Sequence, residues 1–193
     1  AASDVYKRQG TFNANFAGSA VFVTKFDQSG NVLWIEELES FYMLSTLDLG
    51  KGDICIDIND DIVVTGRAWG VAADNKGRGD LFITKYDQDG SNLWFTQVGE
   101  TTDDEGRGIV IDSQNNIYVV GDVGPFHLLM KYDSEGNQIW SMGGTFLTRN
   151  DIAIDSSDNL FVIGDTTIPV DFNPIIGGED IFIEKYDVNG VKH

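Results

Sequence analysis

The sequence has few of the residues on which covalent cross-links and most metal centres depend. Among 193 residues it contains one cysteine, two histidines and three prolines. A single cysteine, Cys55, excludes an internal disulfide framework and a multi-cysteine metal site. No apolar run approaches the roughly 20 residues that a membrane helix needs. With only His127 and His193 available, we predict neither a histidine-based metal triad nor a histidine-based catalytic pair.

Basic residues are also scarce. Lys and Arg total 13 against 31 Asp and Glu, so the net charge is −18. Such a surface repels phosphate backbones and anionic lipid, and we expect neither nucleic acid nor a membrane as partner. The 41% hydrophobic and 11% aromatic fractions exclude a disordered chain. The composition suits a soluble extracellular or cell-surface protein with one packed core.

The first nine residues are expected to differ in origin from the rest. Residues 4–9, Asp-Val-Tyr-Lys-Arg-Gln, match in order the translation of a transposase sequencing adapter. We therefore expect residues 1–9 to be a sequencing artefact and residues 10–193 to form a single domain.

A short motif repeats along the chain. Lys-aromatic-Asp-x-x-Gly occurs four times, and in the first three copies a Trp follows the Gly by four residues. Short apolar runs that end in Asp alternate with this motif, each followed by a Gly nine residues later. The motif lysines are 60, 46 and 54 residues apart, close to the ~40–50 residues of a propeller blade. The repeating residues are Lys25, Lys85, Lys131 and Lys185, then Trp34, Trp94 and Trp140, then Asp57, Asp112 and Asp155.

The runs are rich in β-branched and aromatic residues and are bounded by Asp, Asn and Gly, which favours strands. We predict an all-β fold: a β-propeller with about three to four four-stranded antiparallel blades in an incomplete ring. The blades are expected at residues 10–38 (partial), 53–98, 107–142 and 151–193 (partial). Asp should open each tight turn and Gly should take its left-handed position, while the Trp fills the wedge between blades.

The repeat resembles the SBBP β-propeller repeat family. The resemblance is carried by residues 80–94, Asp-Leu-Phe-Ile-Thr-Lys-Tyr-Asp through Leu-Trp, and by residues 103–121, from Asp-Asp-Glu-Gly through Ile-Tyr-Val-Val-Gly. It implies a secreted or surface-exposed bacterial propeller, often within a larger protein. Residues 37–51 depart from the pattern. Such repeats imply an architecture rather than a chemistry.

Loop lengths distinguish the two ends of the predicted blades. The first-to-second and third-to-fourth strand connections are nearly constant in length, whereas the others vary, and insertions gathered on one face are typical of a binding face. Three basic residues, Lys51, Arg107 and Arg149, are expected just before the innermost strands. They could hold an acidic or sugar ligand; alternatively they are solvated loop charges. The candidate ligand-face residues are Arg67, Trp69, Arg78, Arg107, Arg149 and Asp171.

The sequence offers no catalytic, cofactor-binding or metal-ligating set. The Asp57–Asp61 region lacks the Gly and Glu of a calcium-binding EF-hand loop. The leading hypothesis is a non-catalytic binding or scaffold module of a secreted or cell-surface bacterial protein, with a protein or glycan as partner and no cofactor. The alternatives are a propeller-fold enzyme, similar to quinone-dependent dehydrogenases or lyases, and a structural spacer. An open array is also expected to self-associate through its blade edges.

Overall fold

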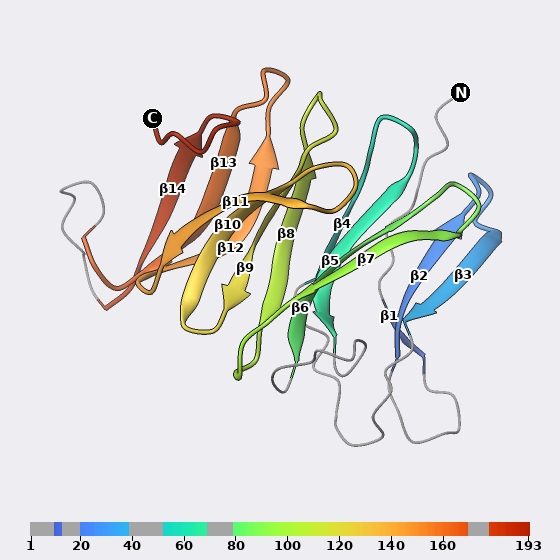
Figure 1. Cartoon of the computed structure of the whole chain (residues 1–193), viewed down its shortest axis with the longest axis horizontal. Helices are drawn as coiled ribbons and strands as arrows, with labels where there is room; N and C mark the ends of the chain where they lie inside the picture. Colours follow the sequence, from blue (N-terminus) through green and yellow to red (C-terminus); the bar gives the residue numbers. More distant parts are fainter. Residues whose placement is uncertain (1–9, 13–19, 39–51, 69–78, 170–177) are drawn as a thin grey trace.

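The computed structural model describes residues 10–12, 20–38, 52–68, 79–169 and 178–193. These ranges contain strands and turns and no helix. In particular, no helix in them is long and apolar enough to cross a membrane. Four antiparallel sheets stand one after another in an open arc (Figure 1).

The four sheets, called blades 1 to 4, follow the order of the chain. Blade 1 contains β1 (Gly10–Phe12), β2 (Ala20–Phe26) and β3 (Val32–Leu38). Blade 2 contains β4 (Asp53–Ile56), β5 (Ile62–Ala68), β6 (Asp80–Tyr86) and β7 (Asn92–Val98). Blade 3 contains β8 (Glu105–Ile111), β9 (Ile117–Val123), β10 (Phe126–Tyr132) and β11 (Gln138–Gly144). Blade 4 contains β12 (Leu147–Ile154), β13 (Leu160–Thr166) and β14 (Asp180–Tyr186).

Each blade is a meander in which consecutive strands pair. The first strands of blades 2, 3 and 4, namely β4, β8 and β12, lie side by side along the inside of the arc. Meanders arranged in this way around their first strands form a β-propeller, and four of them in an arc form part of one. The predicted fold class, an all-β incomplete propeller, is confirmed.

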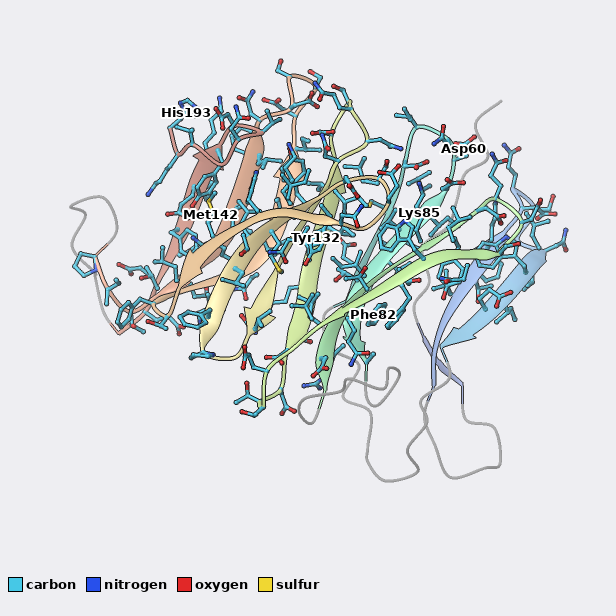
Figure 2. All side chains as sticks on the ribbon, viewed as in Figure 1. Asp60, Phe82, Lys85, Tyr132, Met142 and His193 are labelled. Carbon is cyan, nitrogen blue, oxygen red and sulfur yellow. The ribbon has the colours of Figure 1, made fainter. Side chains whose placement is uncertain are left out.

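The hydrophobic core lies between the blades. Val23 of blade 1 packs with Phe82 of blade 2, Ile83 of blade 2 packs with Tyr132 of blade 3, and further side chains join blades 3 and 4. Figure 2 shows Phe82 and Tyr132 among the crowded side chains of blades 2 and 3. Every residue of β6 is buried, which explains why apolar side chains stand on both of its faces, Leu81 and Ile83 on one and Phe82 and Tyr86 on the other. Each such aliphatic or aromatic side chain stabilises the fold by about 1.5–3 kcal/mol.

The repeating tryptophans join each blade to the next. Trp34 and Trp94 donate their Nε1–H to the backbone oxygens of Gln88 and Ser134, both at 3.0 Å. Each acceptor lies in the last turn of the following blade. A Cβ atom on Gly136 would lie 2.8 Å from the ring of Trp94, and Gly136 also has a φ of +83°. A larger residue at the turn glycine would collide with the tryptophan ring, so the packing of the ring depends on glycine at this position. The predicted wedge role of the tryptophan is observed.

The motif lysines at two positions make a similar link. The Nζ of Lys25 donates to the backbone oxygen of Gln88 at 2.8 Å, and that of Lys131 donates to the backbone oxygen of Val188 at 3.0 Å. Both acceptors again belong to the following blade. The repetition of lysine is therefore structural at these two positions.

The tight turns are built as predicted around an aspartate. Its Oδ1 accepts the backbone N–H groups two and four residues later, as Asp133 does from Glu135 and Asn137. In the last turn of each blade a glycine with a φ of +81° to +91° follows. In the first turn the left-handed position is instead held by Asp or Asn, whose short polar side chains tolerate it. These residues are Asp60, Asn115 and Asp158.

These turns predict a loss of stability in acid. The Asn31 amide lowers the pKa of Asp27, and the backbone N–H groups of Asn159 and Val191 lower those of Asp155 and Asp187. The folded state then binds fewer protons than the unfolded state, so this stability is present above the ordinary aspartate pKa and is lost as the pH falls through the folded values. Urea unfolding should give a constant free energy near neutral pH and a falling one below about pH 4.

The matched variant for this prediction is Asp155→Asn, which removes one of the titrating groups. It should lose less stability than the wild type between neutral pH and pH ~3, where the wild-type carboxylate becomes protonated. A wild-type stability that rises towards low pH would contradict the assignment.

Candidate functional site

The two ends of the blades differ in their connections. At one end, every described turn has five residues, from 27–31 in blade 1 to 155–159 in blade 4. At the other end, called here the variable-loop end, the connections range from two residues between β9 and β10 to fourteen between β3 and β4. The antiparallel order places all the variable connections at this one end. The connections at this end therefore differ in length and sequence from one blade to the next.

Half of the candidate ligand-face residues lie within the described ranges. Trp69, Arg78 and Asp171 lie outside the described residues, as does Lys51. Arg67 lies inside β5, paired with Leu81 of β6, rather than in the loop that follows.

The prediction that Arg107 and Arg149 precede the innermost strands is wrong. Arg107 lies within β8 and Arg149 within β12. Both strands begin earlier than predicted because each contains a bulge that lets the pairing continue past an extra residue.

The two bulges occupy equivalent places in neighbouring blades. In β8 the extra residue is Arg107, between Gly106 and Gly108. In β12 it is Asn150, five residues before the turn aspartate, as Arg107 is in blade 3. A bulge bends its strand and redirects the side chain of the extra residue. Here the two redirected side chains meet: Arg107 Nη1 donates to Asn150 Oδ1 at 2.7 Å.

A line of polar side chains extends from this contact across blades 3 and 4. Arg107 Nη2 donates to Asp122 Oδ2 at 2.5 Å, and the other oxygen of Asp122 lies 2.5 Å from His127 Nδ1. On the other side, Asn150 Nδ2 donates to Asp165 Oδ2 at 2.6 Å. These five residues, called here the polar chain, come from β8, β9, β10, β12 and β13. Hydrogen bonds in which the donor or the acceptor is ionised are short and strong. The polar chain therefore holds the inner strands together at the variable-loop end.

Sequence reasoning missed most of the polar chain. Asp122 and Asp165 both directly follow the glycine of their second strand, and Arg67 holds the same position in blade 2. Such a change from Arg to Asp at one repeat position is visible in the sequence and marks a place where blades differ in charge. His127 lies in β10 and is half-buried against Asp122.

Arg149 has a different environment from Arg107. It is buried, its Nη1 donates to the backbone oxygen of His127 at 2.8 Å, and its Nη2 lies 3.4 Å from Glu184 Oε2 and from Tyr186 Oη. Arg149 thus connects β12 to β10 and β14 inside the fold. A ligand at the surface would not reach it.

The connection between β7 and β8 is held by a buried carboxylate. Asp104 accepts the backbone N–H groups of Glu100 at 2.6 Å and of Gly124 at 2.5 Å, which fixes the connection against the β9–β10 hairpin. Burial raises the pKa of Asp104. Across the residues that the structure describes, no group of three or more His, Cys, Asp or Glu is arranged to hold a metal ion.

Two exposed aromatic side chains lie at the same end of the blades as the polar chain. Phe126 begins β10, and Phe146 lies in the two-residue connection between β11 and β12. Phe126 is 48% exposed and Phe146 is 62% exposed. The two side chains expose aromatic surface at the variable-loop end.

The meanders, the constant turns at one end and the variable loops at the other define the chain as part of a β-propeller. Residues 93–122 match a family model described as SBBP, beta-propeller repeat, which confirms the resemblance found in the sequence. The match runs from β7 through most of β9, across the boundary between blades 2 and 3.

Two further proteins are similar to the chain. An uncharacterized WD repeat-containing protein, L264, of Acanthamoeba polyphaga mimivirus is 25% identical over 166 residues, covering 75% of this chain and 12% of the relative. A solved structure of a protein of unknown function from Bacteroides caccae has a TM-score of 0.50 at 11% identity, covering 95% of this chain and 55% of that one. The chain thus spans about an eighth of the first protein and about half of the second, and the second supports the fold alone.

Proposed function

We propose that the chain is part of a non-catalytic binding or scaffold propeller of a secreted or cell-surface bacterial protein, and that its partner, a protein or a glycan, docks at the variable-loop end. One observation carries the proposal: all variation in connection length lies at the end where the polar chain and the exposed Phe126 and Phe146 also lie. Insertions on one face of a repeat array support a binding role for that face.

The hydrogen bonds of the polar chain support a structural rather than a catalytic role for its side chains. Both carboxylate oxygens of Asp122 are engaged, one by Arg107 and the other by His127. These contacts give Asp122 a role in positioning Arg107 and His127. The polar chain is therefore suited to positioning strands and presenting hydrogen bonds, and no specific observation favours the dehydrogenase-like or lyase-like alternative.

A paired substitution tests the docking face. The full chain is screened against a glycan array and a displayed random-peptide library, and the binders are then tested on Phe146→Ser and on Ile58→Ser. Ile58 is as exposed as Phe146, at 71%, but lies in the five-residue turn of blade 2 at the opposite end. Both changes should leave the fold intact because they remove exposed side chains.

We expect binding to fall at least about tenfold with Phe146→Ser, the loss of roughly 1.4 kcal/mol, and to be unchanged with Ile58→Ser. Equal losses in the two variants would contradict the choice of face. A chain that enriches no binder from either library would instead support a spacer role. Detection of the native protein only in the cytosol of its source cells would contradict the proposed location.

A further inference from the structure

The last strands of blades 1, 2 and 3 share an irregularity on the outside of the arc. These strands are β3, β7 and β11, and among the described residues each of them pairs with one strand only. Each has a bulge at the same place, directly before the repeating tryptophan. In blade 2 the pairing skips Leu93, and in blades 1 and 3 it skips Leu33 and Ile139. The same extra residue is therefore redirected in all three blades.

A large aliphatic side chain is exposed at each of the three bulges. Leu33 is 55% exposed, Leu93 is 49% exposed and Ile139 is 51% exposed. A single exposed leucine is ordinary on a protein surface. Here the exposed aliphatic residue recurs at one position in three blades. Packing between the blades does not account for it, because about half of each side chain remains in water.

The three residues belong to one line that crosses the blades. Trp34, which follows Leu33, lies against Gly90 in the last turn of blade 2, and Leu93 comes three residues after that glycine. The ring of Trp94 makes the same contact with the last turn of blade 3. Exposed aliphatic residues and partly exposed tryptophans therefore alternate along the outer edge. This line, called here the rim stripe, consists of Leu33, Trp34, Leu93, Trp94, Ile139 and Trp140.

The turns beside the rim stripe are acidic. The last turns of blades 1, 2 and 3, residues 27–31, 87–91 and 133–137, contain five Asp and Glu residues and no Lys or Arg. Asp89 and Glu135 are among the exposed ones. The motif lysines of the same blades are buried and engaged in hydrogen bonds or ion pairs. An apolar stripe bordered by negative charge is complementary to a partner with apolar and basic side chains.

We propose that the rim stripe docks a basic amphipathic helix of a partner protein. A second copy of the chain would bring the same acidic turns and a net charge of −18, and an anionic membrane would be repelled as well. An added β-strand would follow one outer strand and reach one bulge, whereas a helix can cross the blades. Packed sheets lie about 10 Å apart, and residues seven or eight apart on one helix face are separated by roughly 10–12 Å. The helix would therefore present an aliphatic residue at every seventh or eighth position, with Lys or Arg beside it. This proposal does not depend on docking at the variable-loop end.

The test uses three fluorescent peptides of about 22 residues, long enough as helices to cross three blades. The first has Leu at every seventh or eighth position, Lys on either side of each Leu, and Ala elsewhere. The second has Glu in place of Lys, and the third has Ser in place of Leu. Fluorescence anisotropy with the full chain should show binding of the first peptide. The other two should bind at least about tenfold more weakly, a difference of roughly 1.4 kcal/mol.

Leu93→Ser, at the middle of the rim stripe, should weaken binding of the first peptide at least about fivefold, because the helix would bury the leucine side chain. The control is Ile58→Ser, at an exposed isoleucine that also has acidic neighbours but lies outside the stripe. It should leave the affinity unchanged, and both variants should fold because they remove exposed side chains.

Three results would overturn the proposal: no binding of the first peptide, equal binding of all three peptides, or equal effects of Leu93→Ser and Ile58→Ser. Phe146→Ser separates this proposal from the proposed function. A loss of peptide binding with Phe146→Ser and not with Leu93→Ser would place the peptide at the variable-loop end, which would overturn the rim stripe and support that docking face.

Discussion

Replacing Lys85 with alanine is expected to lower the free energy of unfolding by about 3–5 kcal/mol. Its Nζ lies 2.7 Å from Asp57 Oδ2 and 3.2 Å from Asp61 Oδ2, and both Lys85 and Asp57 are buried. Burial alone acts to raise the pKa of Asp57, but the hydrogen bonds from Lys85 and Asn115 outweigh it and hold that pKa below its usual value. Without the lysine the carboxylate would remain buried with its main cationic partner removed. Urea unfolding of the two proteins measures the difference.

The control for this prediction is Lys185→Ala, at the same motif position in blade 4. The ammonium group of Lys185 lies over the ring of Phe161 rather than beside a buried carboxylate. A partly exposed cation–π contact contributes about 0.5–1 kcal/mol, so the loss should be no larger. Equal losses in the two variants would show that the aliphatic part of the lysine side chain, and not the ion pair, accounts for the lost free energy of unfolding.

Trp94→Ala is expected to cost about 3–5 kcal/mol, the range for removing a large aromatic side chain from a packed site. Trp94 packs against the cluster between blades 2 and 3, and its Nε1–H is donated to Ser134. Trp94→Phe should recover part of the loss because it restores ring packing without the hydrogen bond. Leu93→Ala, at the exposed neighbouring residue, should cost less than about 0.5 kcal/mol in the same urea experiment.

Two glycines isolate the contribution of the tryptophan ring. Gly30 and Gly136 have the same φ of +83° at the same turn position, but only Gly136 has a tryptophan against it. Alanine at either position strains the backbone, and at Gly136 it also collides with Trp94. Gly136→Ala should therefore be more destabilising than Gly30→Ala by about 1–3 kcal/mol. Equal costs would mean that the ring moves aside without loss.

The repeat, the strands and the turns could be predicted from the sequence because each depends on local chemistry. The apolar runs that became β5, β9 and β13 end at a glycine, and each aspartate-led turn was recognisable from residue types within five positions. The glycine φ values and the burial of both faces of β6 followed from the same pattern. The residues that recur in the sequence of each blade therefore take the same place in the structure of each blade.

The candidate site was predicted less well, because a bulge changes the direction of side chains by a single residue. Arg107 stands five residues before Asp112, whereas Arg149 stands six before Asp155. Successive residues of a strand point to opposite faces, so this difference sends one guanidinium to the polar chain and the other into the fold. The number of residues between each arginine and the turn aspartate that follows it therefore distinguishes the two arginines in the sequence. The partners of Arg107 could not be predicted, since Asn150 and Asp122 are brought to it by pairing between strands and between blades.

The contacts that join each blade to the next determine the order in which the blades unfold locally. The contacts of Trp34 with Gln88, of Trp94 with Ser134 and of Lys131 with Val188 each cross a single boundary. An array held together by nearest neighbours gains stability in steps, one per boundary, and its end units open before its middle ones. Backbone amides should therefore exchange with deuterium most slowly in β6 and β9, each in a blade that has a neighbour on both sides, and progressively faster towards β2 and β14.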